Sequence, residues 1–296
     1  MIKKQDTNEQ YHSSAGISAS GLKLIYKKSV YHYLKRKPFE SAAMAFGSAV
    51  HAAILEPDTF FDQYHIMPKI DRRTKEGKAA FELEQKKAAD KQLLTPEDYD
   101  KIEAILENYR HNDLAQKYCK GVVELSHYTK HNDIDVRVRP DCLNVVEDYI
   151  SDVKTCQDNA PNAFKRDVYK YAYHLQAAFY MDMLGINNFK FIAIETNYPY
   201  SVEVYTLSED MIEAGRSAWK KAFSDYELKV AGSIRISAAK QDLSESNQKK
   251  ANICANYIAN HKKFMNYYDY LRKGYPIATG VIEGACRYLI KDRLDM

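Results

Sequence analysis

The chain has 296 residues, of which 45% are hydrophobic and 28% are charged, a composition typical of a globular protein with a sizeable core. No apolar run approaches the roughly 20 residues that a helix needs to cross a bilayer, and residues 1–10 lack the apolar core of a signal peptide. These features argue against a membrane protein, and we expect a cytoplasmic one.

The net charge of +3 is unevenly distributed along the chain. Residues 246–296 contain 9 basic and 4 acidic residues, whereas residues 1–245 contain 34 basic and 36 acidic residues. Nucleic-acid binding by the body therefore requires a local basic patch. The five cysteines are odd in number and have no CxxC spacing, which argues against a disulfide framework and a structural zinc site.

Hydrophobic periodicity predicts helices in the first part of the chain and strands after them. Expected helices span 18–36, with Ser18 or Ser20 as the cap, then 41–55, 79–92 and 96–118, with a charged loop at 68–78. The last of these helices opens with Thr95 followed by Pro96. From Val122 to Lys154 the residues favour β-structure and predict three or four short strands in a meander.

Helical periodicity returns after the meander, at 161–171 and 173–185, with Gly185 just past the second helix. Strands at 189–196 and 201–207 form an expected hairpin, and a last helix follows at 209–229. This order predicts an α/β or α+β fold in which a small mixed sheet is flanked by helices. We expect a body at 1–230, a polar linker at 231–248 and a basic, helical tail at 249–296.

Charged residues near the end of the meander form a possible site. Asp152 and Lys154 are two apart, so they share one face of a strand. In the preceding strand, Arg137, Arg139 and Asp141 share one parity. If the two strands pair, both aspartates and the lysine converge at the strand ends. The same spacing also fits a solvated pair of strand charges.

This set of side chains suits phosphodiester hydrolysis. Two carboxylates are hard oxygen ligands for Mg²⁺ or Mn²⁺, and the carbonyl of Val153 is a further candidate ligand. Such a metal polarises the phosphodiester and lowers the pKa of bound water. A lysine at the position of Lys154 can orient that water and stabilise the charge on the phosphorane.

Two helices add polar candidates. Gln176 and Tyr180 are four residues apart and share a face, although the same pattern fits a tyrosine in the core with a glutamine at its rim. His51 lies on the inward stripe of the 41–55 helix, one turn after Gly47. It fits either a hydrogen-bonded core histidine or a third metal ligand.

Together these residues resemble a known family. The set is Gly47-Ser-Ala-Val-His51, Arg139-Pro-Asp141, Asp152-Val-Lys154-Thr and Gln176-x-x-x-Tyr180. It resembles the RecB-like branch of the PD-(D/E)xK nucleases, and more closely the exonuclease VIII (RecE-type) nuclease domain of phages and prophages. The runs AVHAAILEP and YHLQAAFYMD are the most specific matches, and the likeness covers about residues 11–228.

The resemblance implies a restriction-endonuclease-like core and roles for the site residues. It implies that His51, Asp141 and Asp152 bind the catalytic metal and that Lys154 supports catalysis. Gln176 and Tyr180 would position DNA or the active-site lysine, and Glu124 is a weaker candidate for metal contact.

The same resemblance implies a substrate and partners. Family members degrade linear double-stranded DNA, typically from the 5′ end, and pass the remaining strand to an annealing protein for recombination. A ring-like homo-oligomer is also implied. The alternative is a catalytically impaired DNA-binding module of a recombination complex. A metal-dependent digestion assay would distinguish this module from an active exonuclease.

Two further comparisons of motifs concern the tail and the cysteines. Residues 249–296, above all GYPIATGVIEGACR, resemble the C-terminal segment of insertion-sequence transposases, which indicates a transposase remnant too short for a complete catalytic core. A disordered or loosely helical basic tail is the simpler alternative. Nucleases of CRISPR adaptation hold an iron–sulfur cluster through four cysteines, but here only Cys119, Cys142 and Cys156 lie in the body, at unsuitable spacings.

Overall fold

A computed structural model describes residues 1–39, 41–240, 249 and 252. The elements of its first half are β1 (Ile2–Lys4), α1 (Asn8–Ser13), α2 (Ala19–Lys27), α3 (Val30–Leu34), α4 (Ala42–Leu55), η1 (Pro57–Thr59), α5 (Phe60–Gln63), β2 (Tyr64–Ile66), α6 (Lys75–Ala88), β3 (Gln92–Leu94), α7 (Pro96–Arg110) and α8 (Asp113–Tyr118). Those of its second half are β4 (Val122–Val123), β5 (Ser126–His131), β6 (Ile134–Val138), β7 (Cys142–Asn144), β8 (Tyr149–Cys156), α9 (Pro161–Lys170), α10 (Tyr173–Leu184), β9 (Asn188–Glu195), β10 (Val202–Thr206) and α11 (Glu209–Lys240).

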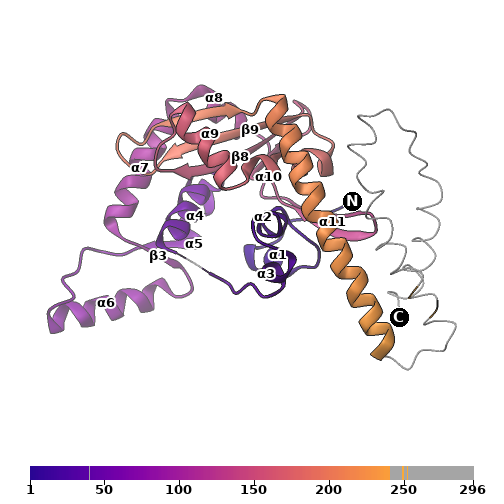
Figure 1. The fold of residues 1–296 in the computed structure, drawn as a ribbon. Coiled ribbons are helices and arrows are strands. Elements are labelled where there is room, and N and C mark those ends of the chain that lie inside the picture. The colour runs from indigo at the N-terminus through magenta and orange to yellow at the C-terminus, as the bar shows by residue number, and fades with distance from the viewer. Residues whose placement is uncertain (40, 241–248, 250–251, 253–296) are drawn as a thin grey trace.

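A five-stranded mixed sheet forms the centre of the fold, in the order β10-β9-β8-β7-β4 (Figure 1). Strands β8 and β9 are parallel, and the other neighbours are antiparallel. Strand β8 has two partners, and its pairing with β7 covers only the residues up to Ser151. The expected small mixed sheet flanked by helices is confirmed, and so are the 189–196/201–207 hairpin and the helices at 41–55, 161–171 and 173–185, each within one residue at either end.

The sheet carries a hydrophobic core on each face. Alternate residues of β9 divide between them, with Phe191 and Ala193 in one core and Ile192 and Ile194 in the other. Helices α2, α9, α10 and α11 supply the first core, and α4, α7 and α8 supply the second. This two-sided burial explains why β9 is a continuous apolar run, as is typical of a strand with both faces covered.

The expected single meander is wrong, because the strands divide between two sheets. Strands β5 and β6 pair with each other, and β5 also pairs with β1, in a separate three-stranded sheet. Strand β6 ends at Val138, and Arg139 and Pro140 carry the chain over to β7. Proline cannot donate to a strand ladder, which favours an end to the strand at this point.

Two of the expected helices are each broken by a second capping residue. The 18–36 segment begins at the Ser18 cap, as predicted, but Ser29 caps a new helix, α3. In the 96–118 segment, Asn112 accepts a hydrogen bond of 2.9 Å from the Ala115 amide and starts α8. Thr74 likewise caps α6 inside the expected charged loop. Each side chain offers an oxygen to a free helical N–H group, which favours a new helix start over continuation.

Helix α11 is longer than expected. It continues to Lys240, so residues 231–240 of the predicted linker are helical. It packs against α10 and α2 (Figure 1), and its buried Glu227 accepts a hydrogen bond of 2.9 Å from the Asn132 side chain in the β5–β6 turn. The remainder of the predicted linker and the predicted tail lie outside the described residues, apart from residues 249 and 252. Within the described part of the chain, no helix combines the length and apolar character needed to cross a membrane.

Candidate active site

The candidate site forms where strand β7 leaves one edge of β8 uncovered. Strand β7 pairs with β8 from Asn144↔Tyr149 to Cys142↔Ser151, and Asp141 directly precedes it. The Val153 amide donates a hydrogen bond of 2.7 Å to Oδ2 of Asp141. The structure therefore brings Asp141 to the strand that carries Asp152, although Asp141 does not share a strand with Arg137 and Arg139 as we expected.

Asp152 is almost fully buried, with 1% of its surface exposed. Its Oδ1 atom accepts a hydrogen bond of 2.6 Å from the Gln176 side chain on α10. Its Oδ2 atom forms an ion pair with the Lys154 ammonium group and has no other polar contact among the described residues. Asp152 and Lys154 thus project from the same face of β8, as their spacing predicted.

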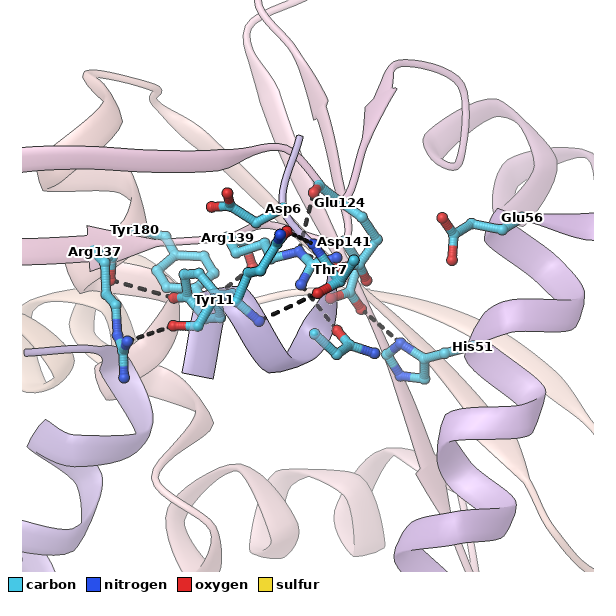
Figure 2. A network of polar contacts seen from close by, with 12 residues as sticks. Asp6, Thr7, Tyr11, His51, Glu56, Glu124, Arg137, Arg139, Asp141 and Tyr180 are labelled. Atoms are coloured by element: carbon cyan, nitrogen blue, oxygen red, sulfur yellow. Dashed lines mark hydrogen bonds and ion pairs between the residues drawn. The ribbon is translucent and has the colours of Figure 1, made fainter. Parts of the chain in front are cut away.

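His51 approaches from α4 and points toward Asp141 (Figure 2). Its Nδ1 atom lies 3.3 Å from Oδ2 of Asp141. Helix α4 packs against β8, and a Cβ atom added at Gly47 would lie 3.1 Å from Oγ1 of Thr155. The glycine therefore permits the close approach of α4 that brings His51 to the strand edge.

Glu124 completes a cluster with His51 and Asp141. One ligand atom from each of the three lies within 4.8 Å of the others. The Glu124 amide donates to the Asp141 carbonyl at 3.2 Å, and its carboxylate pairs with Nε of Arg139 at 2.7 Å. Figure 2 shows Glu56 at the end of α4, on the side toward Glu124. The weaker sequence candidate, Glu124, thus lies beside the stronger ones.

Negative charge is concentrated in this region. Burial raises the pKa of the Asp141 carboxyl group, and the charge of Asp152 raises it further, against the opposing effects of His51, Lys154 and the Val153 amide. Burial, followed by the charge of Asp141, raises the pKa of Glu124 to about 8. Carboxylates that are difficult to ionise together are stabilised when a cation binds between them.

Lys154 is held as a cation within this acidic site. Burial alone would lower the pKa of its ammonium group, but Asp152 and then Asp141 outweigh that effect and raise the pKa above its usual value. The ammonium group also lies 5.1 Å from the centre of the Tyr173 ring. Lys154 therefore stays protonated at neutral pH.

Gln176 and Tyr180 are both buried on α10, and they contact different parts of the site. The Gln176 side chain donates to Asp152, whereas the Tyr180 hydroxyl donates to the Arg139 carbonyl at 3.1 Å. Tyr180 thus fixes the connection between β6 and β7 that delivers Asp141.

Sequence reasoning missed Lys23. Its ammonium group donates a hydrogen bond of 2.9 Å to Oε1 of Gln176, across 153 residues of sequence. Lys23, Gln176 and Asp152 therefore form one polar chain from α2 through α10 to β8. Lys23 lies within the amphipathic 18–36 segment, but no local pattern links that segment to α10.

The mixed sheet flanked by helices, with an acidic pair and a lysine at an open strand edge, defines a restriction-endonuclease-like domain of the PD-(D/E)xK type. The chain belongs to the family of PDDEXK-like domains of unknown function (DUF3799), whose sequence model matches residues 26–235. Membership of this family supports a nuclease function for the chain.

A solved structure has the same fold. It is the crystal structure of a protein from Eubacterium rectale that is named as a candidate exonuclease. The two structures superpose with a TM-score of 0.50 and 14% sequence identity, over 73% of this chain and 83% of that chain. At this identity the likeness concerns the fold alone. No curated protein matches the chain.

Proposed function

We propose that the protein is a Mg²⁺- or Mn²⁺-dependent deoxyribonuclease that degrades linear double-stranded DNA as a 5′→3′ exonuclease. The observation that carries this proposal is the meeting of His51, Asp141, Asp152 and Lys154 at the open edge of β8. The family supports a nuclease, and the name of the structural relative supports an exonuclease. The 5′→3′ direction and a place in phage-type recombination rest on the RecE-type resemblance.

The residues present fit a divalent metal ion. His51 and Asp141, which cluster with Glu124, would hold it together with Asp152 through nitrogen and oxygen atoms, and none of these residues is a thiolate. In an extended strand, the N–H and C=O groups of one residue point to the same edge, so the Val153 carbonyl faces the side on which Asp141 lies. Asp152 Oδ2 is a buried oxygen whose only polar contact within the described part of the chain is Lys154, and Glu124 provides an additional carboxylate. Such an ion, when bound, polarises a phosphodiester and supplies water of lowered pKa.

The protein residues position the reacting groups. The Val153 amide fixes the carboxylate of Asp141, and Gln176 fixes that of Asp152. Lys154 places a permanent positive charge beside Asp152, where it stabilises the charge that develops on the phosphate oxygens during attack by water. These groups are held by bonds to strands and helices, so little reorganisation accompanies the reaction.

The proposed partners follow from the same resemblance. The substrate is a double-stranded DNA end, the remaining strand passes to a single-strand annealing recombinase, and the enzyme works as a homo-oligomer in the cytoplasm. Size-exclusion chromatography with light scattering would test the oligomer. A mass of one chain, unchanged by DNA ends, would contradict it.

Digestion of end-labelled DNA tests the proposed activity. Linear duplexes labelled at the 5′ or the 3′ end, and a closed circle, would be incubated with Mg²⁺, Mn²⁺ or EDTA. We expect early release of the 5′ label, survival of the circle and no digestion in EDTA. Binding without digestion would favour the DNA-binding module, and cleavage of the circle would contradict an exonuclease.

A further inference from the structure

A row of tyrosines and lysines leads from Lys154 to the protein surface. We define this tyrosine–lysine strip by six residues: Lys154, Tyr173, Lys23, Tyr171, Lys27 and Lys170. The Tyr173 ring has the ammonium groups of Lys154 and Lys23 at 5.1 and 5.6 Å from its centre. The Tyr171 ring, stacked on Tyr173 with centres 5.5 Å apart, has those of Lys170 and Lys27 at 4.8 and 5.8 Å.

The turn between α9 and α10 creates this stacking. Ala172 is buried and adopts a left-handed conformation with φ of 54°, which an alanine seldom does. The turn places Tyr171 and Tyr173 ring against ring. The inner ring, Tyr173, also packs against Phe191 in the core, so the strip rests on a rigid support.

The outer part of the strip is open to solvent. Tyr171 is 42% exposed, and Lys27 and Lys170 are exposed beside it. Lys27 donates a hydrogen bond to the Lys170 carbonyl, which joins the end of α2 to the end of α9. An aromatic ring at the surface, with cations on both neighbouring helices, offers a stacking surface and charge at one place.

Positive charge in the strip exceeds the acidic charge that faces it. Four lysines lie along it, whereas three acidic groups face it: Asp152 and Asp141 at the inner end, and Asp167 beside Tyr173 and Lys170. Burial, and then the charge of Lys154, lowers the pKa of Lys23 to about 7. Bound phosphates would relieve this repulsion among the lysines.

We propose that the tyrosine–lysine strip binds a single-stranded stretch of DNA next to the cleavage site, with a base stacked on Tyr171 and phosphates on Lys27 and Lys170. Unpaired bases expose their faces to aromatic side chains, whereas bases in a duplex are stacked on one another. The strip begins at Lys154, so a strand that leaves it enters the candidate active site. This inference rests on the proposed nuclease function.

Binding without cleavage tests the strip. Fluorescence anisotropy would measure the affinity for a labelled single strand of about 12 nucleotides, a length in the range that proteins bind, in EDTA. The variants are Tyr171→Leu, Tyr171→Phe and, as a matched control, Phe61→Leu, since Phe61 is an exposed aromatic residue of α5. Because Tyr171→Leu removes the stacking of one base, we expect it to weaken binding by about 5- to 100-fold. Tyr171→Phe keeps the aromatic ring and should bind the single strand as well as the wild type does. Phe61→Leu should not weaken binding.

The lysines provide a second measurement that does not depend on the Tyr171 variants. Lys170→Gln or Lys27→Gln should each reduce the slope of log affinity against log salt by about 0.7. The control is Lys220→Gln on α11, because Lys220 also lies over an aromatic ring, that of Trp219, outside the strip. An unchanged slope in both strip variants would overturn the proposal, even if Tyr171→Leu failed to fold.

Two results separate this inference from the proposed function. If the wild-type protein binds the single strand through the strip but never cleaves DNA, the proposed nuclease function is refuted and the proposed binding by the strip stands. If the wild-type protein cleaves DNA efficiently and Tyr171→Leu binds the single strand as well as the wild type does, binding by the strip is refuted and the nuclease function stands. A blunt duplex that loses as much affinity as the single strand in Tyr171→Leu would also overturn the assignment to single strands.

Discussion

The Gln176 side chain on α10 donates a hydrogen bond of 2.6 Å to Oδ1 of Asp152 on β8, and both groups are buried. The other end of the same amide accepts a hydrogen bond from Lys23 on α2. The orientation of the Asp152 carboxylate therefore depends on two helices that are far apart in the sequence.

Removing the Gln176 amide should affect both stability and activity. In Gln176→Ala, Oδ1 of Asp152 loses its hydrogen bond while it remains buried, which we expect to destabilise the fold by about 1–3 kcal/mol. The misplaced carboxylate should also slow DNA cleavage. Urea unfolding and cleavage rates would be compared with those of Gln85→Ala, a change at an exposed residue of α6. Wild-type stability and rate in Gln176→Ala would show that the bond does not orient Asp152.

Lys154→Ala should reduce turnover much more than DNA affinity. Its ammonium group is proposed to stabilise charge that develops during the reaction, and loss of such a group lowers rates by about 10²–10³-fold. Single-turnover cleavage in Mg²⁺ and DNA binding in EDTA would separate the two effects. Weak binding with normal cleavage at saturating enzyme would mean that Lys154 only contacts the DNA backbone.

The stability of the protein should fall between about pH 4.5 and pH 7 because of Glu227. Burial raises the pKa of Glu227 from 4.5 in the unfolded chain to about 7 in the folded one, although its bond with Asn132 opposes the rise. Its contribution is therefore greatest below pH 4.5 and is lost as the pH rises through 7, by about 3 kcal/mol.

Glu227→Gln keeps an oxygen for the Asn132 side chain but cannot ionise. Chemical denaturation at pH 5 and pH 8, both in EDTA, should therefore show a smaller decrease in stability for this variant than for the wild type. Equal decreases in the two proteins would contradict a raised pKa at Glu227.

Features of the site that depend on local spacing were predictable from the sequence. The two-residue period of a strand placed Asp152 and Lys154 on one face, and the 3.6-residue period of a helix placed Gln176 and Tyr180 together. Contacts between distant segments were not predictable in this way. The pairing of Lys23 with Gln176 depends on the packing of α2 against α10, and no sequence period records it.

The division of these strands between two sheets was also not predictable from local sequence patterns. Continuous β-forming residues from Val122 to Lys154 indicated one meander, because β-propensity does not specify the partner of each strand. Pro140 belongs to the Arg139-Pro-Asp141 motif, and it also lies in the connection between β6 and β7. Tyr180 bonds to the backbone of that connection rather than to a charged side chain.

Deleting residues 249–296 should leave the proposed nuclease activity largely intact. The candidate residues lie between His51 and Tyr180, and the family match ends at residue 235. The truncated protein, residues 1–248, would be compared with the whole chain by melting temperature and by cleavage at low and high salt. The basic tail could add affinity that decreases with salt. A folded but inactive truncation would contradict this prediction, and a much lower melting temperature would show that the tail stabilises the body.

Cleavage of linear DNA by Asp152→Asn tests the central claim most directly. Asparagine has nearly the same shape but lacks the charge proposed to hold the metal, and Glu147→Gln in the β7–β8 turn is a control at an exposed acidic residue. The wild type and Glu147→Gln should digest linear DNA in Mg²⁺ or Mn²⁺ and not in EDTA, whereas Asp152→Asn should remain folded and show only background cleavage. Wild-type cleavage by folded Asp152→Asn would contradict the assignment of the active site.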